Sequence, residues 1–193
     1  MKIILLLLFS IQIVSAEKDN IVVEDSIFSV EIKRDDWGVP HIYGKTDADV
    51  SFGLAYAHSQ DDYATLEDVI YALRGELASI YGRNFAVNDY YVHLMNYWGM
   101  IDERYESDIA DDVKLVCEGY AAGINKFLHD NPNLKKRSFN KVTAEDIIVG
   151  FSHRMPLMFG LDGVLKKLSK ESPPEFIGSS GDSQEGDFDM LAS

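Results

Sequence analysis

One stretch of the chain decides its fold: Arg34-Asp35-Asp36-Trp37-Gly38-Val39-Pro40-His41-Ile42-Tyr43-Gly44. Apolar and polar residues alternate before this stretch and again at its end, with the Trp-Gly pair between the two runs. Alternation with a period of two is typical of strands, and glycine favours a turn. The pattern predicts a β-hairpin over residues 27–43, with Pro40 near the start of its second strand.

The apolar period lengthens to about 3.6 residues after Gly44. Thr46 or Asp47 can cap a helix start, because each side chain can accept a hydrogen bond from a free backbone amide. Apolar side chains then recur with helical spacing at Phe52, Tyr56, Tyr63, Leu66, Ile70 and Leu73. We expect the hairpin and this helix to form one unit that ends where Arg74-Gly75 interrupts the pattern.

Three blocks of this region resemble the start of the α chain in one known family. They are Arg34-Asp35-x-x-Gly38-Val39-Pro40-His41-Ile42-Tyr43, Asp49-x-x-Phe52-Gly53-x-x-Tyr56-Ala57-His58-x-Gln60-Asp61 and Arg74-Gly75-Glu76-Leu77-x-x-x-Tyr81-Gly82. The blocks and their order are similar to the penicillin acylases and N-acyl-homoserine-lactone acylases, which are N-terminal-nucleophile hydrolases. Asp62 departs from the pattern, because relatives often have arginine there, and we expect a salt bridge to be lost or replaced.

The resemblance implies an α+β fold in which this chain is the α-chain part of an αββα sandwich, mainly helical with an N-terminal β-hairpin. In that family a precursor cleaves itself into α and β chains, and the catalytic serine begins the β chain. The implied reaction is hydrolysis of N-acyl amides, penicillin-like or acyl-homoserine-lactone-like, by a heterodimer with the β chain of the same precursor. This part alone is expected to be inactive.

The two ends of the chain differ in composition from its centre. Residues 1–16 have a basic start, an apolar run and small residues at the end, a pattern that predicts a signal peptide and a periplasmic or secreted protein. Residues 17–168 are expected to form the acylase α-chain region. Residues 169–192, rich in Gly, Ser and Asp, predict a flexible spacer or propeptide. Apolar residues return at Phe188, Met190 and Leu191, so we expect the chain to be truncated at 193.

Ser193 is the catalytic nucleophile that the resemblance implies, because it follows the spacer. The alternative is that Ser193 is an ordinary residue near an arbitrary end of the sequence. Cys117 lies in a helical pattern and is interpreted as a small buried residue, since a cysteine nucleophile would need a base partner that the spacing does not suggest.

Thr143 is expected to cap a helix with an apolar face at Ile147, Ile148 and Phe151 and a kink or break at Pro156. The resemblance implies that Met155 and Phe159, with Met158 between them, bind the acyl group. A methionine-rich helix suits an adaptable apolar pocket, although plain core packing is equally compatible with it.

Net charge and motifs exclude several other classes of function. A formal charge of −14 disfavours nucleic acid and anionic membranes as partners, and we expect no membrane contact after signal cleavage. No phosphate-binding loop or zinc motif is present, and Asp61, Asp62, Glu67 and Asp68 are interpreted as a solvated helix face. No metal or cofactor is predicted, because the glutamate that holds calcium in some relatives falls near Leu165.

The segments between the two main helical regions are less regular. Asn84 to Gly99 predicts one or two short helices, followed by a helix that Ser107 or Asp108 caps and Asn131-Pro132 ends. Residues 135–137 form a basic run that is interpreted as a solvated loop. The competing hypothesis for the whole chain is a non-catalytic extracytoplasmic binding or scaffold protein, which would not need Ser-Asn after the spacer.

Overall fold

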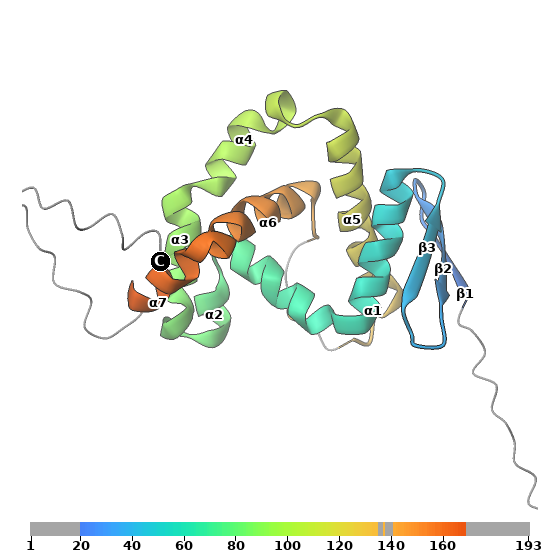
Figure 1. Ribbon diagram of the computed structural model, residues 1–193, viewed down its shortest axis with the longest axis horizontal. Helices are drawn as coiled ribbons and strands as arrows, with labels where there is room; N and C mark the ends of the chain where they lie inside the picture. The colour runs from blue at the N-terminus through green and yellow to red at the C-terminus, as the bar shows by residue number, and fades with distance from the viewer. Residues whose placement is uncertain (1–19, 135–136, 138–140, 169–193) are drawn as a thin grey trace, which may run out of the picture.

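The computed structural model describes residues 20–134, 137 and 141–168 (Figure 1). The signal peptide expected at residues 1–16 and the spacer expected at 169–192 lie outside these residues. A small sheet stands at one end, and helices make up the rest of the described chain (Figure 1). None of the described helices is long and apolar enough to cross a membrane.

The sheet has three antiparallel strands in the order β1 (Asn20–Glu24), β2 (Ser29–Arg34) and β3 (Pro40–Gly44). Strands β2 and β3 form the predicted hairpin, with Ile32 opposite Ile42, and β3 begins at Pro40 as expected. Strand β1 was not predicted. It pairs with β2 from Ser29 to Lys33 and adds the buried Val23 to the core.

Local hydrogen bonds explain the turn between β2 and β3. The Asp35 carboxylate accepts hydrogen bonds from the backbone amides of Trp37 and Val39, both at 2.9 Å. Gly38 has a φ of +82°, a left-handed conformation that favours glycine. The predicted glycine turn is therefore confirmed.

Arg34 ties this turn to the helix that follows. Its guanidinium donates to the Gly38 carbonyl at 2.8 Å and to the Gln60 side chain at 3.2 Å, and it pairs with Asp61 at 2.8 Å. Arg34, whose side chain is largely buried, thus joins the first two sequence blocks.

Helix α1 (Asp47–Arg74) begins at Thr46, whose side chain forms a reciprocal capping box with Asp49. Asp62 interrupts the helix with φ −154° and ψ 66°, and its carboxylate accepts a hydrogen bond from the Thr65 amide at 3.1 Å. Asp62 therefore caps the second half of α1, where relatives often carry arginine. The bend lets the two halves of α1 face different neighbours (Figure 1).

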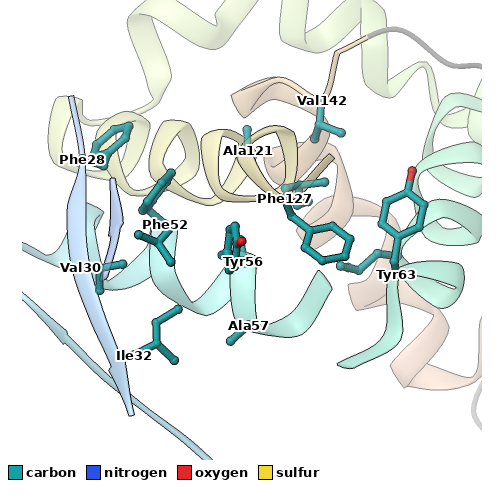
Figure 2. Close-up of a cluster of buried hydrophobic side chains, with 14 of the residues drawn as sticks. Phe28, Val30, Ile32, Phe52, Tyr56, Ala57, Tyr63, Ala121, Phe127 and Val142 are labelled. Atoms are coloured by element: carbon teal, nitrogen blue, oxygen red, sulfur yellow. The ribbon is translucent and has the colours of Figure 1, made fainter. Parts of the chain in front are cut away.

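Helix α5 (Asp111–Asp130) packs closely against the first half of α1. Aromatic rings fill the space between these helices and the sheet, including Phe28 stacked on Phe52 at 5.7 Å and Tyr56 edge-on to Phe127 at 5.7 Å (Figure 2). Cys117 is buried in α5, and burial raises the pKa of its thiol. That environment fits a structural residue.

Two charged residues are more buried than predicted. Glu67 is 6% exposed and accepts hydrogen bonds from the Tyr63 hydroxyl at 3.4 Å and the Arg137 amide at 2.6 Å. Arg137, expected in a solvated loop, contacts Asp68 and lies over the Tyr81 ring at 5.0 Å. The solvated-face interpretation is wrong for Glu67, because a distant backbone amide replaces the lost water.

The middle of the chain contains α2 (Leu77–Tyr81), the 3-10 turn η1 (Arg83–Phe85), α3 (Ala86–Met95) and α4 (Tyr97–Asp108). The expectation of short helices between Asn84 and Gly99 is confirmed. The predicted cap of α5 is wrong, since Asp108 ends α4, where it pairs with Arg104, and Ala110 precedes α5. The extended backbone of Ile109 separates the two helices.

Helix α6 (Ala144–Pro156) passes between α4 and the second half of α1 (Figure 1). It continues into the π-helical turn η2 (Leu157–Leu161) and helix α7 (Asp162–Leu168). The predicted break at Pro156 is confirmed, because regular α-helix ends at this residue. Gly160, with φ +95°, departs from helical backbone geometry within η2.

Candidate functional site

The candidate site lies on the C-terminal end of α6 and on η2, where the sequence placed Met155, Met158 and Phe159. Their exposed fractions are 48%, 67% and 78%, and Phe151, one turn before Met155, is 69% exposed. We call these four side chains the apolar strip. Core packing, the alternative for these methionines, does not describe such exposed side chains in this chain.

The N-terminal end of α6 is held by a buried ion pair. Thr143 caps the helix as predicted and forms a capping box with Asp146, which is fully buried. Arg74, at the end of α1, donates to both Asp146 oxygens at 2.9 and 2.8 Å and to the Lys141 carbonyl at 3.1 Å. A two-pronged contact of this kind fixes orientation as well as distance.

The C-terminal end of α6 is held by His153, to which the sequence analysis assigned no role. Its ring is 7% exposed and its Nε2 lies 3.0 Å from the side-chain oxygen of Asn88 in α3. The rings of Tyr91 and Tyr97 pack against it, at 5.4 and 6.4 Å. The only sequence signal was the seven-residue spacing from Asp146, which places both side chains on one helix face.

The buried face of α6 is therefore not the face that the sequence predicted. Asp146, Val149 and His153 point into the protein, whereas Phe151 and Met155 point away from it. Ile147 and Ile148, at the sides of the helix, are half-buried. This arrangement leaves the apolar strip exposed among the residues that the structure describes.

A hollow of about 210 Å³ lies between α4 and α6, lined by Tyr97, Ile101, Tyr105, Ile148 and Ser152 among others. Burial, followed by the negative charge of Glu145, raises the pKa of Tyr105 to about 12, so this phenol stays protonated at neutral pH. Substrate pockets usually enclose about 300–1,000 Å³. The hollow is smaller than that range.

Two further positions came from the resemblance, Ser193 and the residue near which a calcium ligand falls in some relatives. Ser193 lies outside the described residues, so the structure does not place it relative to the strip. Leu165, near which the resemblance put the calcium ligand of some relatives, packs in α7 against the cluster that contains Leu73 and Tyr91. Within the described part of the chain, no group of His, Cys, Asp and Glu side chains could hold a metal ion.

Comparisons with known proteins agree on one family. The model of the penicillin amidase family matches residues 29–167. The chain is 25% identical over 158 residues to the acyl-homoserine lactone acylase PvdQ of Pseudomonas fluorescens (strain Pf0-1), covering 75% of this chain and 20% of that protein. It is 27% identical over 121 residues to penicillin G acylase of Escherichia coli, covering 61% of this chain and 14% of that protein.

Among solved structures, the thermostable penicillin G acylase from Alcaligenes faecalis matches with a TM-score of 0.58 and 23% identity, over 76% of this chain and 85% of that chain. This likeness shows the fold and confirms the expected α+β class, mainly helical with an N-terminal hairpin. The chain spans a fifth or less of the length of the two curated relatives above. The family match covers well over half of this chain, from the hairpin to α7, and the chain therefore belongs to the penicillin amidase family.

Proposed function

We propose that this chain is the α portion of a periplasmic or secreted, self-processing acylase that hydrolyses N-acyl amides together with the β chain of the same precursor. One observation carries the proposal: the apolar strip of Phe151, Met155, Met158 and Phe159 stands exposed on the outer side of a firmly anchored helix. An acyl chain is the part of such a substrate that this surface would bind.

The chemical step is assigned to Ser193, as the first residue of the β chain. Its hydroxyl attacks the amide carbonyl carbon, and its own α-amino group takes the proton, since an unperturbed α-amino group has a pKa of about 7.7 to 8. The amide C–N bond breaks, the amine leaves with a proton, and water hydrolyses the acyl-serine ester. Cys117 is no rival nucleophile, because burial raises the pKa of its thiol.

Substitutions in the apolar strip test the binding role. Met155→Ala and Phe159→Ala in the complete acylase should enlarge the acyl site and shift preference toward longer or bulkier acyl groups, with each methylene contributing about 0.8 kcal/mol. The measurement is kcat/KM over N-acyl amides of increasing chain length. Met95→Ala, at the end of α3 and outside the strip, is the control. An unchanged chain-length profile in both strip variants would remove these residues from the site.

Substitutions of Ser193 test the catalytic role. In the complete precursor, Ser193→Ala should leave an uncut and inactive polypeptide, because cleavage and hydrolysis both start with this hydroxyl. Ser193→Cys should still be cut, since a thiol can make the same attack. N-terminal sequencing of the wild-type β chain gives the independent check: a start at any other residue takes Ser193 out of the mechanism.

A further inference from the structure

Helix α6 has polar anchors at two levels of its buried face. Asp146 meets Arg74 near the N-terminal end, and His153 meets Asn88 near the C-terminal end. The anchors are seven residues apart and so lie on one face, with Val149 buried between them. Phe151 and Met155 project from the opposite side. The contacts on the buried face of α6 therefore fix the position of the apolar strip on its exposed face.

The hydrogen bond of His153 has a defined direction. The side-chain nitrogen of Asn88 donates to the Ala72 carbonyl at 2.9 Å and contacts the Asp89 carboxylate at 3.3 Å, so the amide oxygen faces His153. An amide oxygen only accepts, and His153 must therefore carry its hydrogen on Nε2. Through Asn88, this one bond links α6 to α3 and to the end of α1.

Among the described residues, Tyr91, Tyr97, Asp89 and Arg154 are the other polar side chains near His153. The hydroxyls of Tyr91 on α3 and Tyr97 on α4 lie 2.6 Å apart and bond each other. Asp89 is the carboxylate beside Asn88, and Arg154 follows His153 in α6. Burial, followed by the positive charge of Arg154, lowers the pKa of His153, so the imidazole is neutral at neutral pH.

We propose that His153 is a positioning residue of the acylase: by its bond to Asn88 it holds the last turn of α6 and thereby sets where Met155, Met158 and Phe159 meet the acyl chain. The inference rests on the proposed function. His153 is two residues before Met155 and three residues before the break at Pro156. Beyond that point the backbone follows the irregular η2 turn, so the anchor lies at the last regular turn before the strip's end.

The test uses the complete acylase and a series of N-acyl para-nitroanilides of increasing acyl length. His153→Leu keeps apolar bulk without a donor and should change the ratio of kcat/KM between long and short acyl chains by about fivefold, mainly through KM. His153→Gln places an amide N–H near the former Nε2 and should keep the wild-type ratio. Ser51→Ala removes a distant buried bond to the Val116 carbonyl and should leave the ratio unchanged.

The pH dependence of the same ratio separates positioning from stability alone. In the wild type, His153 is neutral above its lowered pKa and becomes charged as the pH falls through it, so the ratio should change on the acid side of pH 6.5. The His153→Gln variant should show a flat ratio. Nucleophile and base are common to all substrates, so their own titration cancels when the ratio is taken.

A second readout does not depend on turnover. In protein labelled at the methionine methyl groups, the NMR signals of Met155 and Met158 should move with His153 protonation in the wild type and stay still in His153→Gln. Signals that move equally in both proteins, or an active His153→Leu enzyme with the wild-type ratio, would overturn the inference and leave the acylase function standing. A complete protein without activity on any acyl amide would overturn the acylase function itself, and the inference with it.

Discussion

Asp49 shows how one side chain couples the hairpin to the helix. Its carboxylate accepts hydrogen bonds from the Ser29 amide at 3.0 Å and the Thr46 amide at 3.0 Å, so it joins β2 to the cap of α1. These bonds, first the one from Ser29, lower the pKa of Asp49 below its ordinary value of 3.8. An ionised Asp49 carboxylate that accepts both of these hydrogen bonds stabilises the folded state.

Asp49→Asn should reduce the free energy of unfolding by about 1 kcal/mol at neutral pH, because the amide nitrogen that replaces one carboxylate oxygen cannot accept a hydrogen bond, so one of the two backbone amides loses its acceptor. The folded-state pKa is depressed, so this contribution is present above pH 3.8 and is lost as the pH falls through the lowered pKa. Urea denaturation at a series of pH values should show the difference between wild type and variant closing in acid. The exposed Asp47→Asn, in the same helix turn, controls for charge alone; an equal effect in both variants would contradict the bonding role.

Helices α1 and α5 owe their close contact to two glycines. A Cβ atom at Gly119 would lie 2.3 Å from the Ala48 carbonyl oxygen, and one at Gly123 would lie 2.1 Å from that of Phe52. Both neighbours are backbone atoms, which cannot move without shifting a whole helix. The closeness of these helices brings the rings of Phe52 and Phe127 into the same core (Figure 2).

Gly123→Ala should lower the free energy of unfolding by about 2 kcal/mol, although alanine is the better helix former by about 1 kcal/mol. The free-energy cost of pushing α1 and α5 apart would exceed the gain from the higher helix propensity of alanine. Gly163→Ala in α7 is the matched control, because nothing lies within 4 Å of the added methyl, and it should be neutral or slightly stabilising. Thermal unfolding of both variants measures the contrast. Equal stabilisation would show that the two helices can separate freely.

The whole molecule combines a well-packed core with an exposed apolar strip, and large patches of that kind mark binding surfaces. The chain expressed alone should bind a hydrophobic dye and should not hydrolyse acyl amides. Phe159→Ser should reduce the dye signal, whereas Trp37→Ser, at the isolated tip of the hairpin and 91% exposed, should change it less. A monomer that binds no dye and hydrolyses an acyl amide would contradict this expectation.

The sequence by itself determined the features that depend on neighbours a few residues away. The glycine turn at Gly38, the capping boxes of Thr46 and Thr143 and the break at Pro156 all follow from hydrogen bonds or steric limits within about one helical turn. The local blocks also identified the family, and in the folded chain Arg34 of the first block meets Gln60 and Asp61 of the second.

Only the tertiary structure decided which side of each element is buried. Both sides of α6 carry apolar residues, so their period could not show that Val149 and His153 turn inward and Phe151 outward; the partners that settle it, Arg74 and Asn88, come from α1 and α3. The burial of Glu67 likewise depends on an amide 70 residues away. Such contacts are selected by the free energy of the whole packed core, which no short window of sequence contains.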